Sequence, residues 1–205
     1  DRRERDVFAY GQARSDHLKA PDRALGRAID RIGPIERGVI PDVFASLVHS
    51  VVAQQISGAA ARTVWSRLLA RFGAITPAVI QAAPVEDLRQ CGLSMRKASY
   101  IKGLGEAAAD GTLDLAALPD LPDDEVIARL SSLRGIGVWT AEMVLIFAMQ
   151  RPDVVSWGDL AIRRGMMMLY GRSELNRPAF DRYRRRYSPY WAVSSLYLWR
   201  FAGGG

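Results

Sequence analysis

Apolar residues recur every three to four positions along almost the whole chain. The clearest case is segment 43–52, whose apolar positions are Val43, Phe44, Leu47, Val48, Val51 and Val52. This spacing places side chains on one face of a helix. Alternation of apolar and polar residues, the mark of a half-buried strand, is almost absent, and its best example, 153–157, is short. The pattern therefore predicts an all-α protein of roughly ten helices.

Capping residues, prolines and glycines predict where the helices begin and end. Pro21 precedes a segment with apolar residues on one face, Ser57 and Ser94 are suited to helix N-caps, and Gly73 is suited to a helix end. Further helices are expected over 76–83, 83–90, 95–111, 121–133, 138–150, 160–171, 178–187 and 189–201.

The length and the apolar content bound the class of protein. The 205 residues, 49% of them hydrophobic, suffice for one domain or for two small lobes with a shared core. No apolar run approaches the roughly 20 residues of a membrane helix, and no signal-like leader is evident, so no membrane partner is expected. The single cysteine, Cys91, excludes an intramolecular disulfide and a cysteine-ligated iron–sulfur cluster, and it fits a reducing cytoplasm.

The charge balance favours a polyanionic partner. The net charge is +6, and arginine supplies nearly all of the basic residues, because lysine occurs only at positions 19, 97 and 102. Arginine binds phosphate with two parallel hydrogen bonds more readily than lysine does. Many basic proteins bind no polyanion, so the charge alone decides nothing.

The segment LRGIGVWTAEM, residues 133–143, places glycines on both sides of Ile136. One interpretation is a turn between helices, in which Gly135 and Gly137 supply positive φ angles. The other is a helix–hairpin–helix, in which backbone N–H groups at a helix N-terminus bind a DNA phosphate that approaches only where side chains are missing.

Segments 133–147 and 153–165 closely resemble the helix–hairpin–helix DNA glycosylase superfamily, above all its 3-methyladenine DNA glycosylase II group, which excises alkylated purines. The resemblance continues, in the same order, through 44–68, 88–115 and 189–201. It implies two helical lobes with a cleft between them. A single glycosylase domain over 1–205 is expected, with lobe one at 42–150, its hairpin at 122–150, and lobe two formed by 1–41 and 151–205. An N-terminal α/β domain, which some relatives carry, is not expected in so short a chain.

The resemblance assigns the catalytic carboxylate to Asp159, which lies 22 residues after Gly137 and opens a helix. Cleavage of an N-glycosidic bond builds positive charge on the sugar, and a fixed carboxylate stabilises that charge. The alternative role is a plain helix N-cap, which is compatible with catalysis. Asp153 is the competing carboxylate, and it is expected to end the preceding turn.

The resemblance also places aromatic residues in a base pocket. Trp139 occupies the position at which lyase-active relatives carry their Schiff-base lysine, which implies a monofunctional enzyme that leaves an abasic site. Trp199 matches another pocket aromatic, Trp157 lies two residues before Asp159, and Met143 replaces an aromatic of some relatives. Stacking of a cationic alkylated base on indole adds a cation–π attraction of about 1–2 kcal/mol. The alternative interpretation of Trp139 is a tryptophan buried in the core at helical spacing.

DNA contacts are expected from several elements. Gln55 matches the side chain that fills the gap left by a flipped base, with an ordinary polar helix end as the alternative. Arg163 and Arg164, one turn past Asp159, are candidates for phosphate contacts, with a solvated arginine face as the alternative. The arginine run at 184–186 is interpreted as a solvated face. The full predicted DNA-binding set is Gln55, Ser57, Gly58, Gly135, Ile136, Gly137, Thr140, Arg163 and Arg164.

No cofactor is required for the expected chemistry. By resemblance alone, the backbone carbonyls of Ser131, Leu133 and Ile136 hold a structural Na⁺ or K⁺ at the hairpin. The two histidines, His17 and His49, lie far from Asp159 in sequence. His49 lies on a predicted core helix and is interpreted as a structural residue.

The expected activity is removal of alkylated purines from double-stranded DNA by a monomeric protein of a bacterial-type cytoplasm. A non-enzymatic hairpin module that only grips DNA is the alternative, and Asp159 with Trp139 and Trp199 argues against it. A glycosylase for oxidised or mismatched bases is disfavoured by the missing lysine and cysteine cluster. The lesion stays open among 3-methyladenine, 7-methylguanine, 1,N6-ethenoadenine and hypoxanthine.

Overall fold

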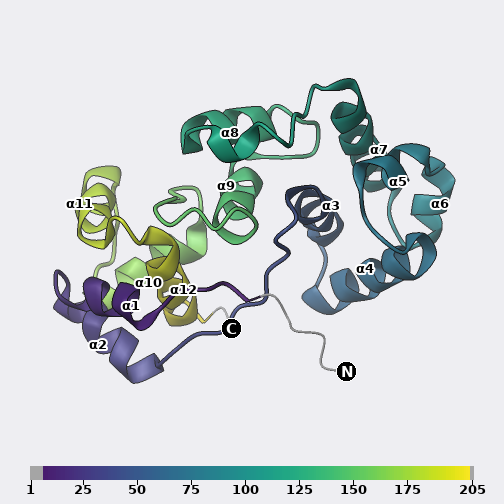
Figure 1. Cartoon of the computed structure of the whole chain (residues 1–205). Helices are drawn as coiled ribbons and strands as arrows, with labels where there is room; N and C mark the ends of the chain where they lie inside the picture. Colours follow the sequence, from purple (N-terminus) through teal and green to yellow (C-terminus); the bar gives the residue numbers. More distant parts are fainter. Residues whose placement is uncertain (1–6, 204–205) are drawn as a thin grey trace. The chain divides into compact units, whose positions relative to one another are not determined.

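The computed structural model describes residues 7–203, so the charged tract at 1–6 and the last two residues lie outside the described part. Over the described range the chain forms twelve α-helices and one 3-10 turn, and its only extended pairing is an isolated antiparallel bridge between Val7 and Gly38 (Figure 1). The all-α prediction is confirmed. Segment 153–157, the best strand candidate, forms no strand.

The helices fall into two compact units. One consists of the described residues up to Val39 together with those from Gln150 onward, and the other runs from Ile40 to Met149. The lobes expected from the sequence, 1–41 plus 151–205 and 42–150, differ from these units by one or two residues at each boundary. The cleft expected between the lobes stays a prediction.

The continuous unit is built around the segment with the clearest apolar spacing. Phe44, Leu47, Val48, Val51 and Val52 are fully buried there, as the pattern predicts, whereas Val43 is half-buried. In Figure 1, α5 lies beside α7, and α8 and α9 form the arms of the hairpin. The elements are α3 (Val43–Ala53), α4 (Gly58–Phe72), α5 (Pro77–Ala82), α6 (Val85–Gln90), α7 (Met95–Asp110), η1 (Leu118–Asp120), α8 (Asp123–Ser131) and α9 (Val138–Phe147).

The discontinuous unit has a central helix made from the C-terminal segment. Residues 191–198 of this helix are all buried, because the four other helices of the unit contact it. The elements are α1 (Gln12–Lys19), α2 (Arg23–Ile32), α10 (Leu160–Tyr170), α11 (Arg177–Tyr187) and α12 (Trp191–Phe201). The apolar spacing did not predict α1, which buries only Ser15 and Leu18 and has no side-chain N-cap.

Short polar side chains set the start of most helices. Each accepts a hydrogen bond from the backbone N–H three residues later, which satisfies one of the donors that a helix leaves unpaired. The residues that do so are Asp22, Asp42, Ser57, Thr76, Ser94, Asp159 and Asn176.

One of these caps, Asp22, also forms a buried polar cluster. Its carboxylate accepts hydrogen bonds from the Leu25 N–H at 2.9 Å, the Tyr170 hydroxyl at 2.6 Å and the Arg186 guanidinium at 3.1 Å. The hydroxyl groups of Tyr170 and Tyr187 are hydrogen-bonded to each other. The cluster therefore ties α2 to α10 and α11, and it gives Arg186, one of the three consecutive arginines, a structural partner.

Candidate functional site

The carboxylate of Asp159 is buried, with 6% of the residue exposed. One oxygen caps α10 by accepting the Ile162 N–H at 2.9 Å, and the other accepts the indole N–H of Trp199 at 3.1 Å. Asp159 therefore acts as the N-cap of α10, as the alternative role predicted. Two donors and the positive end of the α10 dipole hold this carboxylate in a defined orientation.

Trp199 reaches Asp159 because α10 and α12 are in backbone contact. A Cβ atom added to Gly165 would lie 2.2 Å from the carbonyl oxygen of Leu198, the residue before Trp199. Only glycine allows this approach. Gly165 was not singled out from the sequence, although a glycine inside a helix costs stability relative to alanine and signals a packing reason.

Arg37 is a third member of this site that the sequence did not reveal. Its guanidinium carbon lies 5.1 Å from the centroid of the Trp199 ring, while the residue as a whole stays exposed to solvent. Partial desolvation of the guanidinium lowers the pKa of Arg37, and the negative charge of Asp159 partly offsets that effect. An isolated arginine in a loop carries no sequence signal, because only the fold brings it to Asp159.

The loop that carries Arg37 is held at several points. The Phe8 N–H donates to the Arg37 carbonyl at 2.8 Å, and the Ile35 N–H donates to the Tyr10 hydroxyl at 2.7 Å. The hydroxyl of Tyr197, on α12, donates to the Gly33 carbonyl at 3.2 Å. The position of Arg37 therefore depends on α12, the same helix that supplies Trp199.

The other two candidates near Asp159 have separate partners. The Asp153 carboxylate accepts a hydrogen bond from the Ser188 hydroxyl at 2.6 Å, which fits a structural role in the loop. The ring of Trp157 packs edge-on against Phe180 at 4.9 Å between centroids, and the guanidinium groups of Arg163 and Arg177 lie over it at 4.7 and 5.4 Å. Trp157 is thus placed with Phe180, Arg163 and Arg177, and its pocket role stays a prediction.

Helix α9 presents its pocket candidates in two different ways. Trp139 is 50% exposed, so the alternative reading of a core tryptophan is wrong. Thr140 and Met143 are buried, with 8% and 9% exposed. Of the three, Trp139 is the aromatic residue, and half of its surface is exposed.

Glycine occupies positions 135 and 137 of the hairpin for different physical reasons. Gly135 has a φ of +90°, and a Cβ atom there would lie 2.5 Å from the Tyr100 ring. The turn and the Tyr100 ring therefore both require glycine at position 135. The idea that side chains are missing here only to let DNA approach is wrong for this position. Gly137 has a φ of −87°, which any residue adopts, and a Cβ atom there would meet nothing within 4 Å. The open space at Gly137 suits the approach of a ligand to the N-terminus of α9.

The Gln55 loop is connected to this hairpin. Gln55 is exposed and has a φ of +56°, a conformation rare for residues other than glycine. Gln54, beside it, donates its side-chain amide to the Gly135 carbonyl at 2.8 Å. The Lys97 ammonium donates to the carbonyls of Val52 and Gln54 at 2.8 and 2.5 Å. Neither Gln54 nor Lys97 was singled out from the sequence, although Lys97 is one of only three lysines.

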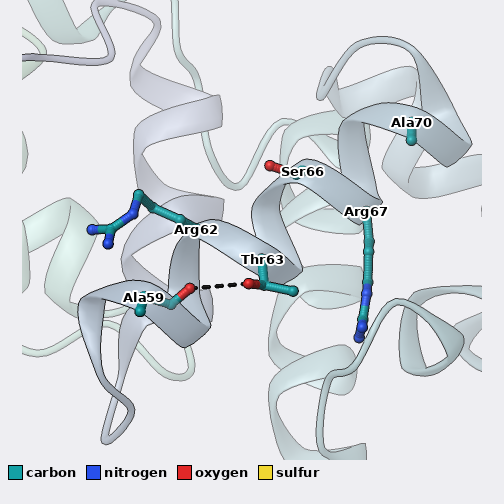
Figure 2. A pocket seen from close by; sticks show the side chains of 6 residues that line it. All are labelled: Ala59, Arg62, Thr63, Ser66, Arg67 and Ala70. Atoms are coloured by element: carbon teal, nitrogen blue, oxygen red, sulfur yellow. Dashed lines mark hydrogen bonds between the residues drawn. The ribbon is translucent and has the colours of Figure 1, made fainter.

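The N-terminus of α4 begins at Gly58, and Ser57 already takes the N–H of Ala60 at 3.2 Å. A depression of about 600 Å³ follows along the outer face of α4, lined by Ala59, Arg62, Thr63, Ser66, Arg67 and Ala70. In Figure 2 the side chains of Arg62 and Arg67 point apart. The depression therefore offers a basic surface and does not gather its charges onto one small ligand.

The remaining basic candidates differ in exposure. Arg163 is half-buried on Trp157, Arg164 is exposed, and Arg186 pairs with the buried Asp22. Of these three arginines, Arg164 is the one most open to a phosphate.

The expected cation ligands are carbonyl groups of the hairpin. The Leu133 carbonyl accepts the Ile136 N–H at 3.1 Å within the turn, and a carbonyl has a second lone pair for a cation. A monovalent cation at Ser131, Leu133 and Ile136 stays a prediction. No three histidine, cysteine, aspartate or glutamate side chains within 7–203 are grouped as metal ligands, and no helix in that range is long and apolar enough to cross a membrane.

Comparison with protein families identifies one match over most of the chain. A family model described as the HhH-GPD superfamily of base excision DNA repair proteins matches residues 48–185. A putative DNA-3-methyladenine glycosylase of Bacillus subtilis is 30% identical over 169 residues, which are 77% of this chain and 58% of that protein. DNA-3-methyladenine glycosylase 1 of Schizosaccharomyces pombe is 29% identical over 192 residues, 90% of this chain and 84% of the relative.

Solved structures agree with these sequence matches. A DNA-3-methyladenine glycosidase of Bacillus halodurans superposes with a TM-score of 0.83 at 34% identity, covering 96% of this chain and 92% of the other. The 3-methyladenine DNA glycosylase of S. pombe, solved in complex with abasic DNA, gives 0.79 at 28% identity, with 92% and 96% covered. The fold and the motif resemblance found in the sequence are both confirmed.

Proposed function

This chain belongs to the HhH-GPD superfamily of base excision DNA repair proteins, and we propose that it is a DNA glycosylase that removes alkylated purines from double-stranded DNA. The relatives named as DNA-3-methyladenine glycosylases support the substrate class. The neighbour solved with abasic DNA supports an abasic site as the product. The same comparisons favour an enzyme over a hairpin module that only grips DNA.

The single observation that carries the proposal is the buried, doubly hydrogen-bonded carboxylate of Asp159. As the bond between base and sugar breaks, positive charge develops on the sugar ring. A preorganised carboxylate in a site sheltered from water stabilises that charge without having to reorient. Hydrogen bonds from Ile162 and Trp199 fix the direction in which the two carboxylate oxygens point. In this proposal the same carboxylate also orients or deprotonates the attacking water.

The proposed enzyme has no lyase activity. A lyase needs a free amine to form a Schiff base with the sugar, and Trp139 stands at the position where the resemblance expects that lysine. The three lysines of the chain have other partners: Lys19 pairs with Asp30, Lys97 binds Val52 and Gln54, and Lys102 binds the carbonyls of Gln81 and Ala83.

The DNA is held through its backbone in this proposal. The open N-terminus of α9 at Gly137 and the start of α4 at Ser57 and Gly58 accept phosphates, while Gln55 fills the gap that the flipped base leaves. Gly135, Ile136 and Thr140 belong to the same hairpin, and Arg163 and Arg164 add positive charge. A monovalent cation on the hairpin carbonyls would neutralise part of the phosphate charge. We place the protein in the cytoplasm as a monomer.

The pocket aromatics complete the proposal. Trp139 presents a half-exposed ring for stacking, and Trp199 lies against the catalytic carboxylate. Met143 lies one turn from Trp139 on α9, while Trp157 has its own cluster and is the weakest of the pocket candidates.

The test is Asp159→Asn in single-turnover cleavage of duplexes that each carry one lesion, with abasic sites revealed by hot alkali. Base release is expected to fall by orders of magnitude, because each 1.36 kcal/mol of lost stabilisation is a factor of ten. Duplex binding should survive. Asparagine keeps one acceptor and turns an N–H toward either Ile162 or Trp199, so a stability loss of about 1–2 kcal/mol is expected as well.

Asp153→Asn is the matched control, because Asp153 has a structural partner in Ser188. It should release base at nearly the parental rate. Release at the parental rate by the Asp159 variant would overturn the proposal for this residue. Strand breakage by the parent before alkali would contradict the monofunctional assignment.

A further inference from the structure

A cavity of about 320 Å³ lies beside the loop that carries Gln55. Its walls come from the end of α3, the Gln55 loop, α4, the segment before α7 and α7 itself, all within the unit Ile40–Met149. Asp159 is not among the residues that line it, so the cavity does not contain the proposed catalytic group. Its place next to Gln55 calls for a different explanation.

The lining of this cavity combines buried apolar side chains with exposed polar ones. Val52, Val64 and Leu93 are buried and supply the apolar surface. Gln55 and Ser94 are exposed and supply an amide and a hydroxyl group. A lining of this kind suits a flat heterocycle, which presents apolar faces and polar edges.

The ammonium group of Lys97, which also lines the cavity, has one donor left over. It donates to the carbonyls of Val52 and Gln54 at 2.8 and 2.5 Å. An ammonium group has three N–H donors, and within residues 7–203 the third has no acceptor. Lys97 is half-buried, and an unused donor in such a place favours a ligand that brings an acceptor.

We propose that this cavity receives the base of the complementary strand that loses its partner when the lesion flips, and that Lys97 recognises a carbonyl oxygen of that base. This inference rests on the proposed glycosylase function and on the role of Gln55 as the side chain that fills the gap. When Gln55 occupies the gap, the unpaired base of the other strand lies next to it. Gln55 is itself part of the cavity wall, so the unpaired base meets a concave surface there.

The proposed substrates decide which base this is. Alkylated purines arise from adenine and guanine, so the complementary strand carries thymine or cytosine opposite them. Both pyrimidines have a carbonyl oxygen at O2, which faces the minor groove in duplex DNA. A donor that reads O2 accepts either pyrimidine, which suits an enzyme that acts on lesions of both purines.

A backbone phosphate is a less suitable occupant. It would bring a negative charge against the buried apolar surface of Val52, Val64 and Leu93, and burial of a charge is costly. The single unused N–H of Lys97 would offset little of that cost. A neutral pyrimidine places its ring against the same surface and needs one donor for its carbonyl.

The test measures binding to duplexes in which a tetrahydrofuran abasic analogue replaces the lesion, so that no base pair forms at that position. The opposite residue is thymine, cytosine, difluorotoluene or a second abasic analogue. Difluorotoluene has nearly the shape of thymine, but the fluorine in place of O2 is a poor acceptor. Dissociation constants for all four duplexes are measured at one salt concentration. Release of alkylated bases is measured separately.

The parent protein should bind the thymine and cytosine duplexes about tenfold more tightly than the other two, as expected for one hydrogen bond from a charged donor. Lys97→Met should lose most of this preference. Lys102→Met is the matched control, because Lys102 lies on the same helix and donates to the carbonyls of Gln81 and Ala83 but does not line the cavity. It should keep the parental preference.

A second variant fills the cavity while leaving Lys97 and its carbonyl partners in place. Val64→Phe adds a ring to the cavity wall, so it should also lose the preference for pyrimidines. A purely structural role of Lys97 would weaken binding to all four duplexes alike and leave their ratio unchanged. Thermal melts show which variants are folded, and the comparison of thymine with difluorotoluene in the parent requires no variant.

The outcomes separate this inference from the proposed function. If the parent releases no base from any alkylated duplex, the proposed function fails. If it releases base but binds all four abasic duplexes equally, the cavity is not a base site and the function stands. Equal binding of thymine and difluorotoluene would overturn recognition by Lys97. A preference that survives in folded Lys97→Met and Val64→Phe proteins would overturn it as well, because another surface would then read the base.

Discussion

The side-chain amide of Gln54 donates a hydrogen bond to the carbonyl of Gly135 over 2.8 Å. This bond joins the loop that presents Gln55 to the turn of the hairpin. Lys97, on α7, donates to the carbonyls of Val52, in the last turn of α3, and of Gln54, in the loop. The element proposed to fill the flipped-base gap and the element proposed to bind phosphate therefore form one connected structure.

Gln54→Leu should slow base flipping while leaving phosphate binding nearly intact. Leucine keeps the bulk of the side chain but removes its donor, so the Gln55 loop loses its link to Gly135. The stability cost is about 1 kcal/mol, the net value of one hydrogen bond. A fluorescent base analogue beside the lesion reports flipping, and salt-dependent titration reports binding. Gln55→Ala, which removes the proposed gap-filling side chain itself, is the comparison variant and should slow flipping as well. Equal flipping rates for Gln54→Leu and the parent would contradict a coupling between the Gln55 loop and Gly135.

Substitution at Gly135 should mainly lower stability, whereas substitution at Gly137 should mainly lower DNA binding. Gly135→Ala should destabilise the fold by about 1–3 kcal/mol, because alanine is strained at a φ of +90° and its Cβ meets Tyr100. Gly137→Val should cost about 1 kcal/mol or less, because the backbone there is extended and the space is open. Valine should instead weaken binding to undamaged and damaged duplex alike.

Chemical denaturation and duplex titration of both variants check this pair. A Gly137→Val protein that loses only its preference for lesions would count against a phosphate role for the hairpin. Steep weakening of parental binding with added salt is expected in the same titrations, because phosphate contacts release counterions.

The sequence predicted the helical class and most helices, because periodic apolar faces and short polar caps are local signals. Segment 43–52 and the caps Ser57 and Ser94 show this. Helix α1 was missed because it buries only two of its residues. A local pattern detects a helix only when one face is apolar.

Site residues were predictable where a motif carries them. Asp159 and Trp199 lie 40 residues apart, and the motif resemblance predicted a site role for each, but not the hydrogen bond between them. Arg37 has no motif of its own and reaches the site only through the packing of its loop. Gly135 showed the limit of motif reasoning, because the contact with Tyr100 that requires its glycine is made by a residue on another helix.

Stability should fall at high pH because of the tyrosines around Asp22. Burial raises the pKa of Tyr170 and of Tyr187 well above the ordinary value, and the neighbouring hydroxyl and carboxylate add to this for Tyr170. These tyrosines stay neutral in the folded state and ionise in the unfolded state. Their contribution is therefore complete below about pH 10 and is lost as the pH rises further.

Denaturation at about pH 8 and about pH 11 measures this loss. Tyr170→Phe should lower stability at the lower pH by about 1–3 kcal/mol, because the buried carboxylate of Asp22 loses a donor. The same variant should show a smaller further loss at the higher pH. An unchanged pH slope in the variant would assign the effect to other tyrosines.

Gly165→Ala tests whether the contact between α10 and α12 positions the candidate carboxylate. The added methyl group would lie 2.2 Å from the Leu198 carbonyl oxygen, so the two helices must separate. Overpacking of this kind costs about 1–3 kcal/mol, and Trp199, the next residue, should move away from Asp159. Base release should then fall even at temperatures where the variant is folded, because the carboxylate loses its indole donor. Trp199→Phe, which removes only the N–H donor, is the comparison variant. If Gly165→Ala lowers the melting temperature while a folded sample releases base at the parental rate, then the close helix contact serves stability alone.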